Sequence, residues 1–253
     1  MSLPARSHPF PLILAALLLG TALSGCFNPF DPLKAPTRGF SKPAPEPTSP
    51  IGVLRLYEWC WNKRDPDVYR ILFTDDYQFQ FAQTDSAGNA YRNRPLGRQD
   101  EIDIATNIFV RGTATEPPPA SISLTFDANL VALPDSRRGK NERVHKEIAA
   151  NTLLRIEQPD IEVQGVTRFF VVRGDSAVLP DELLKRFGRD STRWYIERID
   201  DETLNDDQQG TVRAALGTRS GPASAADYAP VHVSWGRVRA FWDFRNVGVA
   251  LKP

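Results

Sequence analysis

The chain has 253 residues, of which 41% are hydrophobic and 25% charged, enough apolar side chains for a sizeable globular core. Its 31 basic and 31 acidic residues balance to a net charge of zero. Because phosphate recognition depends on clustered Lys and Arg, this balance argues against a nucleic-acid partner.

An apolar segment lies at the start of the chain. Residues 10–23 follow Arg6, are too short to span a bilayer of ~30 Å as a helix, and have the length expected in a signal peptide. The motif at 23–26, LSGC, resembles the lipobox of bacterial lipoproteins. The resemblance implies that residues 1–25 are a signal peptide and that Cys26 is lipidated. The alternative is an ordinary secretory leader with a chance cysteine.

A lipid on Cys26 would hold the protein on a membrane without crossing it. Two or more acyl chains anchor firmly, and the resemblance implies a diacylglyceryl group. Phe27 follows, and the absence of Asp at this position resembles the sorting pattern of outer-membrane lipoproteins. We therefore expect the protein to lie in the cell envelope of a Gram-negative bacterium, at the periplasmic face of its outer membrane.

Residues 26–50 are predicted to be a tether between this lipid and a globular domain at 51–253. Seven prolines lie between residues 27 and 50 with few aliphatic side chains, so no core can form there. A proline-rich ligand for a partner is the alternative, but no repeated PxxP register supports it.

Residues 50–81 are predicted to form two helices and a strand. The first helix has apolar side chains at i, i+3, i+4 and i+7: Val53, Leu56, Tyr57 and Cys60. Pro66 ends that helix and suits the first turn of the next. We expect a turn at 74–76, and then a strand in which Tyr77, Phe79 and Phe81 share one face.

Further along, a short edge strand is predicted at 89–94, and a helix from Gly97 to Gly112. Four long strands are predicted around 121–133, 148–156, 162–173 and 193–200, with a helix at 180–187 before the last. Short loops between successive strands favour an antiparallel meander. Helices first and a meander afterwards predict an α+β domain.

This order of elements, together with the sequences at 55–81, 94–109 and 193–202, resembles the NTF2-like superfamily, also called SnoaL-like. The resemblance covers about 50–202 and implies a cone in which helices pack on a curved antiparallel sheet. In that superfamily the cavity of the cone is an enzyme site, a ligand pocket or a protein-binding surface, and many members pair as homodimers through the open sheet face.

The ketosteroid isomerases of that superfamily place a general-base aspartate near the end of the first strand. The matching position here is about Phe81, which cannot accept a proton, so isomerase chemistry loses its main support. Asp75 and Asp76 are interpreted as turn residues. The sequence therefore predicts no catalytic residue.

No metal or cofactor is expected either. His145 and His232 belong to no spaced ligand cluster, and the acidic residues at 200–207 lack the glycine and final glutamate of a calcium loop, which favours a solvated face. Cys60 lies on an apolar helix face and is interpreted as a core thiol, not a nucleophile.

The tail is predicted as a loop at 203–230 and an aromatic helix at 234–242. Trp235, Val238, Phe241 and Trp242 fall on one side of that helix. Its packing onto the domain is the favoured interpretation. The alternative is a helix that docks a partner or a membrane, because Arg237, Arg239 and Arg245 lie among the aromatics.

These observations predict a module that binds a small apolar ligand or an envelope protein. The second hypothesis is an isomerase, dehydratase or cyclase with an acid or base on a strand facing the cavity, where Asp127, Asn151 and Tyr195 are candidate lining residues. A purely structural envelope protein is the third.

Overall fold

The computed structural model describes residues 43–82, 95–114, 117–158, 160–203 and 231–243. The folded unit begins at Ala44, six residues before the predicted end of the tether. The Pro47 carbonyl accepts a hydrogen bond from the Trp194 amide at 2.8 Å. The Ser49 hydroxyl accepts from the Gly52 amide at 2.9 Å and caps the first helix. These contacts move the start of the domain from residue 51 to about residue 44.

Two helices and a strand follow, as the sequence predicts. They are α2 (Pro50–Lys63), α3 (Pro66–Tyr69) and β1 (Phe73–Gln80). The prediction of a turn at 74–76 is wrong, because these residues belong to β1. The strand bulges there: Phe73 pairs with Ile196 and Gln78 with Arg198, so four residues of β1 oppose one residue of its neighbour. The bulge leaves Asp75 and Asp76 exposed without ending the strand.

The second half of the domain contains the long strands. The elements are β2 (Leu96–Gly97), α4 (Arg98–Thr106), the π-helical turn η2 (Asn107–Arg111), β3 (Ser121–Phe126), β4 (Leu133–Pro134), β5 (His145–Glu157), β6 (Ile161–Arg173), α5 (Asp181–Phe187), β7 (Trp194–Thr203), β8 (Val231–His232) and α7 (Trp235–Trp242). Gly112 ends the α4–η2 helix at a φ of 71°, as expected of a glycine in this position. The predicted strand at 89–94, most of the loop at 203–230 and Arg245 lie outside the described residues.

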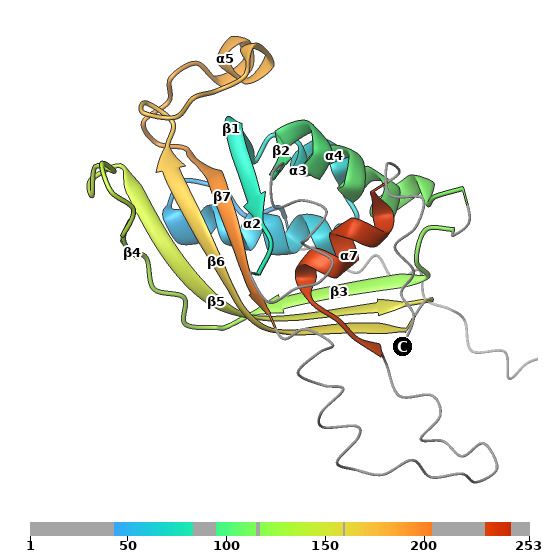
Figure 1. The fold of residues 1–253 in the computed structure, drawn as a ribbon. Helices are drawn as coiled ribbons and strands as arrows, with labels where there is room; N and C mark the ends of the chain where they lie inside the picture. Colours follow the sequence, from blue (N-terminus) through green and yellow to red (C-terminus); the bar gives the residue numbers. More distant parts are fainter. Residues whose placement is uncertain (1–42, 83–94, 115–116, 159, 204–230, 244–253) are drawn as a thin grey trace, which may run out of the picture. The chain divides into compact units, whose positions relative to one another are not determined.

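The strands form one curved sheet in the order β2-β1-β7-β6-β5-β3, with β4 beside β5 and β8 beside β6 (Figure 1). The predicted meander is confirmed, because β3, β5, β6 and β7 pair antiparallel in turn. The sheet is mixed, however, since β1 runs parallel to β7 and β8 parallel to β6. The predicted α+β class, with helices packed on a curved sheet, is confirmed.

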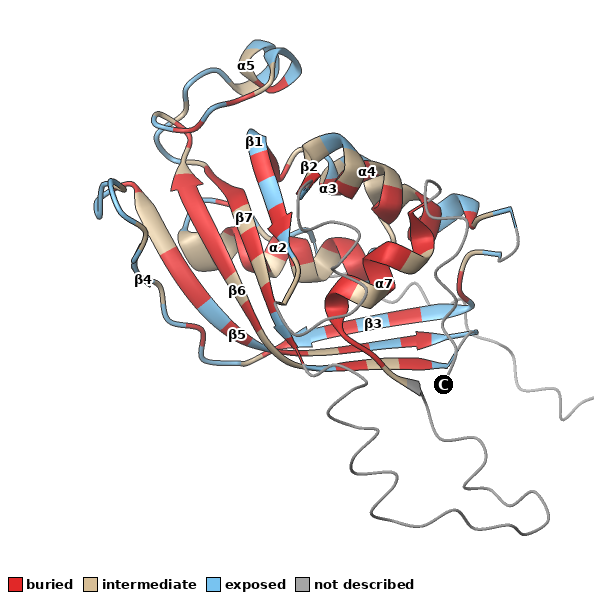
Figure 2. Cartoon of the chain, in the orientation of Figure 1, coloured by how far each residue is buried: buried red, intermediate tan, exposed pale blue. Residues whose placement is uncertain are grey.

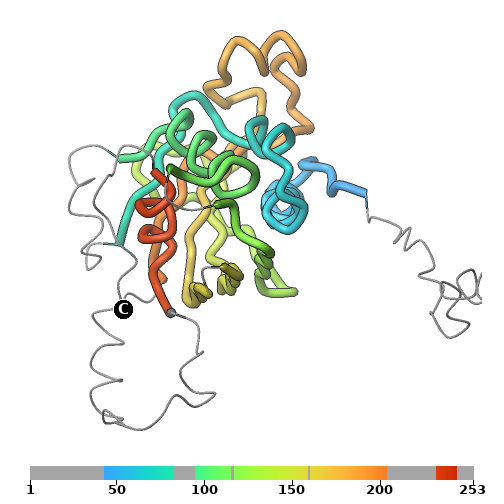
Figure 3. The backbone as a smooth tube through the Cα atoms, turned by 90° about the vertical axis from the view of Figure 1, so that its right-hand side faces the viewer, coloured from blue at the N-terminus to red at the C-terminus, as the bar shows by residue number. Residues whose placement is uncertain are grey.

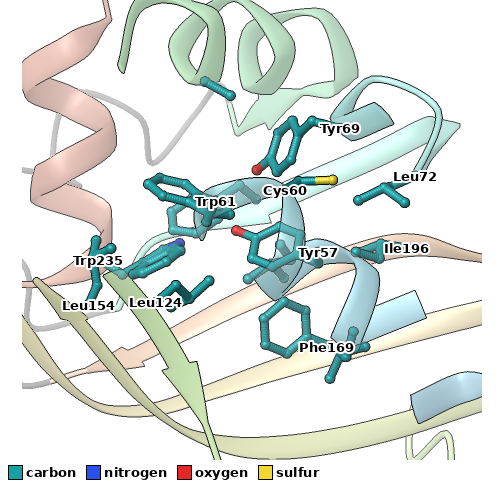
Figure 4. Close-up of a cluster of buried hydrophobic side chains, with 14 of the residues drawn as sticks. Tyr57, Cys60, Trp61, Tyr69, Leu72, Leu124, Leu154, Phe169, Ile196 and Trp235 are labelled. Atoms are coloured by element: carbon teal, nitrogen blue, oxygen red, sulfur yellow. The ribbon is translucent and has the colours of Figure 1, made fainter. Parts of the chain in front are cut away.

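Helices α2, α4 and α7 cover the concave face of the sheet, and α7 runs alongside α4 (Figures 1 and 3). The strand residues that face these helices are buried (Figure 2). The five alternating positions of β5 from Ile148 to Ile156 are all buried, as expected of a strand with one face toward the core. Aromatic side chains fill the layer between helices and sheet, and Tyr57 contacts Tyr69 and Phe169 with ring centroids 5.3 and 5.4 Å apart (Figure 4).

Helix α2 also bonds to the backbone of the edge strand β3. The Asn62 side chain donates to the Leu124 carbonyl and accepts from the Leu124 amide, each at 2.8 Å. One turn earlier, Glu58 accepts from the Phe126 amide at 3.1 Å. These side chains occupy backbone groups that an edge strand would otherwise offer to another strand.

Candidate functional site

A buried ion pair lies between the helices and the sheet. Arg239 of α7 and Glu101 of α4 are both about 1% exposed. The Arg239 guanidinium donates to both carboxylate oxygens, at 2.8 Å from Nε and 2.7 Å from Nη2. Its Cζ atom also lies 4.1 Å from the ring centroid of Phe79 and 4.8 Å from that of Trp235. The two opposite charges therefore balance each other inside a shell of aromatic rings.

Three tyrosines surround the pair. The Tyr69 hydroxyl donates to Glu101 at 2.5 Å, and Arg239 Nη2 donates to the Tyr57 hydroxyl at 3.0 Å. Burial raises the pKa of Tyr57 to about 12, although Arg239 opposes the rise. Burial, and then the charge of Glu101, raise the pKa of Tyr69 and of Tyr77 well above 10. The phenols are therefore neutral hydrogen-bonding groups at physiological pH.

Several buried donors near this pair have no acceptor among the described residues. They are Nη1 of Arg239, the indole nitrogens of Trp61, Trp235 and Trp242, and the hydroxyl of Tyr77, which Glu101 approaches closely enough to affect its pKa without forming a hydrogen bond of ordinary geometry. The ring centroids of Trp61 and Trp235 are 5.0 Å apart, and the Arg239 guanidinium lies 4.8 Å from the Trp235 ring. Three of these donors therefore come from neighbouring side chains. A buried donor without an acceptor costs about 1–3 kcal/mol, so three of them on neighbouring side chains make this region the candidate site.

Helix α7 is fixed at both ends, which positions Arg239. Asp201 at the end of β7 accepts from the Gly236 amide at 2.6 Å in the first turn of α7, and the Thr203 hydroxyl accepts from the Trp235 amide at 2.8 Å. Asn107, in the π-helical turn, donates to the Trp242 carbonyl at 3.1 Å. Arg239 therefore packs inside the domain, as the favoured interpretation of the aromatic helix predicts. It does not belong to an exposed docking surface, which was the alternative.

The acidic run at 200–202 is divided between two environments. Asp201 is buried, and burial raises its pKa to about 6 although Thr203 and Gly236 donate to it. Asp200 pairs with Arg198, and Glu202 with Arg168. The interpretation of this run as a wholly solvated face is corrected for Asp201, because the start of α7 covers its side chain. Residues 204–207 lie outside the described part.

The three candidate lining residues do not come together. Asn151 donates to Asp127 through its amide side chain, at 2.9 Å, and through its backbone, at 2.8 Å, on the solvent side of the sheet. Tyr195 is buried in a separate apolar cluster with Val172 and Leu183. Asp127 and Asn151 therefore form one pair, and Tyr195 lies apart from it.

The remaining chemistry candidates have structural surroundings. Cys60 is a free, buried thiol, and burial raises its pKa far above the ordinary value, as expected of a core cysteine. In the described ranges no group of three or more His, Cys, Asp or Glu side chains could hold a metal ion. Within the same ranges, none of the helices has the length and apolar character to span a membrane.

The sequence reasoning missed the Arg239–Glu101 pair, whose members are 138 positions apart. The neighbouring Asp100 caps this helix by accepting from the Gly97 amide at 3.0 Å, which leaves the Glu101 carboxylate free to pair with Arg239. One signal was available: Glu101 shares the stripe i, i+4, i+7 with Ala105 and Ile108, so it lies on the apolar face of its helix. A charge at such a position needs a buried partner.

Comparison with known proteins finds no similar sequence and only a limited similarity of fold. No protein-family model matches the chain, and no curated protein is similar to it. Among solved structures, a protein of unknown function from Mycobacterium tuberculosis has 12% identity and a TM-score of 0.43, covering 78% of this chain and 88% of that one. A protein from Novosphingobium aromaticivorans, provisionally named a scytalone dehydratase, has 14% identity and a TM-score of 0.40, covering 60% and 79%.

A third similar structure is an NTF2-like superfamily protein from Salmonella enterica serovar Typhimurium. Its identity is 13% and its TM-score 0.36, covering 68% of this chain and 88% of that one. At these values none of the three bears on activity.

Proposed function

We propose that the chain is a lipid-anchored protein of the cell envelope, and that its NTF2-like α+β domain binds a small, largely apolar, neutral molecule. The anchor part rests on the LSGC motif at 23–26 and on the proline-rich segment that follows it. The binding part rests on the described domain.

One observation supports a ligand of this chemistry: unsatisfied donors beside an ion pair that is already neutral. Arg239 is balanced by Glu101, so an added anion would leave an uncompensated buried charge. Arg239 Nη1, Tyr77 and Trp235 nevertheless offer N–H or O–H groups. A carbonyl, ether or hydroxyl oxygen would satisfy them without adding charge, and the surrounding aromatic rings would pack against an apolar remainder.

Native mass spectrometry of the chain purified gently from its own host tests the binding part. A discrete adduct is expected, and Tyr77→Phe, which removes one unsatisfied donor and keeps the ring, should lower its occupancy. Tyr195→Phe is the matched control, because it removes a buried hydroxyl without an acceptor from the separate cluster. An apo mass in the wild type, or equal loss in both variants, would contradict the proposal.

Radioactive palmitate tests the anchor part independently. Cells expressing the full chain should label it, and Cys26→Ser should abolish the label and move the protein to the soluble fraction. A Cys26→Ser chain that still pellets with membranes would contradict the lipid anchor.

A second candidate function is an isomerase, dehydratase or cyclase. It is favoured by the 2.5 Å hydrogen bond between the Tyr69 hydroxyl and Glu101, since a neutral phenol held in place by a carboxylate is a group that can donate a proton to a substrate. It is weakened because Glu101 already accepts from Arg239 at both oxygens. Turnover of the molecule identified by mass spectrometry, lost in Glu101→Gln, would favour this candidate over simple binding.

A further inference from the structure

The point where the tether joins the domain can be located on the sheet. The Pro47 carbonyl accepts from the amide of Trp194, the first residue of β7. Trp194 pairs with Arg173, the last residue of β6, and the Arg173 amide donates to the Val144 carbonyl at 2.9 Å, just before β5. Pro47, Trp194, Arg173 and Val144 are thus successive neighbours across one end of the sheet. The chain from Cys26 enters the domain at this end.

The same end carries a hairpin of unusual composition, residues 131–146, which we call the basic hairpin. It contains five basic residues and two acidic ones, a net charge of +3 in a chain whose net charge is zero. Arg138 and Arg143 are exposed and Lys146 is half-buried, and none of the three forms an ion pair within the described residues. Val131 and Leu133, two positions apart and so on one side of an extended chain, are 62% and 59% exposed.

The basic hairpin is held against the sheet by its other cations. Arg137 and Lys140 both pair with Glu197 of β7, which offsets one positive charge. Arg137 also pairs with Asp135 at 2.6 Å and stacks 4.3 Å from the ring centroid of Phe170. Arg138 and Arg143 are therefore presented from a fixed loop, so a surface that binds them has little loop order to impose.

Glu142 lies within the basic hairpin and is counted in its net charge, and Asp175, beside the hairpin, is paired with Arg173 at 2.8 Å, whereas two other exposed carboxylates at this end are distant from it. Asp75 and Asp76 lie near the start of β1, three strands away from β5 in the sheet, or roughly 14 Å at a strand spacing of about 4.8 Å. That separation exceeds the Debye length of about 8–10 Å at physiological salt. The positive charge of the hairpin is consequently little screened by them.

We propose that the basic hairpin contacts the anionic headgroups of the membrane in which the lipid on Cys26 is inserted, with Val131 and Leu133 entering the interface. This rests on the proposed lipid anchor, which brings this end of the sheet to the bilayer. Cations that project toward anionic lipid, beside exposed apolar side chains, bind such a surface electrostatically and by burial. The hairpin thus orients the domain on the membrane as a second contact besides the lipid.

A vesicle experiment tests the inference without the lipid. The chain from residue 26 with Cys26→Ser is mixed with vesicles of phosphatidylethanolamine and phosphatidylglycerol, or of phosphatidylcholine alone, and bound protein is measured by sedimentation. We expect binding to the anionic vesicles at low salt, weakened by added salt. Arg138→Gln with Arg143→Gln should lower the binding constant roughly 30-fold, since each cation near an anionic surface contributes about fivefold. Val131→Ser with Leu133→Ser should weaken binding to both kinds of vesicle.

The matched control is Lys63→Gln with Arg111→Gln, which removes two exposed charges from the ends of α2 and η2. It should leave vesicle binding within about twofold of the parent chain, because screened charges away from the contact contribute little. Equal loss in both double variants, equal binding to both kinds of vesicle, or no binding at low salt would overturn the inference. Palmitate labelling of Cys26 with no vesicle binding would refute the hairpin contact alone. Vesicle binding without labelling would refute the anchor alone.

Discussion

The side chains of Arg239 and Glu101 meet through two hydrogen bonds, 2.7 and 2.8 Å long, in the interior of the domain. This pair links α7, the last described element of the chain, to α4. The strands from β3 to β8 lie between these two helices in the sequence, so the pair joins distant parts of the chain. Removing the pair should therefore lower the stability of the domain as well as ligand binding.

Removing one partner of this ion pair should be strongly destabilising. We expect Arg239→Met to lower the free energy of unfolding by about 3–5 kcal/mol, because it leaves the Glu101 carboxylate buried and uncompensated. Arg239→Met combined with Glu101→Gln should lose less than the sum of the two single variants. Urea unfolding measures both, and Arg155→Ala, in an exposed pair with Glu162, serves as a control that should lose less than about 1 kcal/mol. Equal losses at the two pairs would contradict the role of burial.

Asp201 should give a measurable pH dependence of stability. Burial raises its pKa from 3.8 to about 6 in the folded state, so between these values the folded state binds more protons than the unfolded one. Its contribution is greatest below pH 4 and is lost as the pH rises through 6. The difference in unfolding free energy between wild type and Asp201→Asn should fall by on the order of 3 kcal/mol from pH 4 to 7.

Asp190 provides the control for that pH series. Its hydrogen bonds from Thr192 hold the pKa of its carboxyl below the ordinary value. The sign is therefore reversed: the contribution of Asp190 is present above the ordinary pKa and lost as the pH falls. Asp190→Asn should give a slope opposite to that of Asp201→Asn, and slopes of the same sign would refute the assignment to Asp201.

The contact between Asn62 and Leu124 should protect the edge of the sheet. Asn62→Ala removes both hydrogen bonds to the Leu124 backbone and should cost about 1–2 kcal/mol of unfolding free energy. The Leu124 amide should then exchange its hydrogen faster, and the protein should self-associate more readily through the freed edge. Lys63→Ala, one residue along on the exposed side of α2, should change neither quantity. Unchanged exchange in Asn62→Ala would show that water replaces the side chain fully.

Cys60 should be unreactive in the folded protein. Its thiol is fully buried, and burial raises its pKa so far that almost no thiolate forms near neutral pH. In a chain with Cys26→Ser, a thiol reagent such as Ellman's should react only after denaturant unfolds the domain. Rapid reaction of the native chain would mean that α2 opens readily or that the thiol is accessible.

Local patterns in the sequence were sufficient for most elements of this fold. The i, i+3, i+4, i+7 stripe of α2, the proline that starts α3 and the alternation along β5 depend on neighbouring residues, because burial on one face of a helix or strand follows its own period. The antiparallel order of β3, β5, β6 and β7 follows from short connections between long strands. The bulge at Asp75 and Asp76 could not be predicted, because two consecutive aspartates are compatible both with a turn and with a bulged strand.

The tertiary structure alone decided the candidate site. Arg239 and Glu101 come together only because α7 returns onto α4, and no local period relates residues so far apart. Asn151 alternates with the buried Ala150 and Thr152, and Asp127 follows the last residue of β3, so the two side chains meet on the outer side of the sheet, bonded to each other. The lipid motif at 23–26, by contrast, is local, and the sequence by itself supports that expectation. What only the fold could add is that Pro47 and the basic hairpin share one end of the sheet.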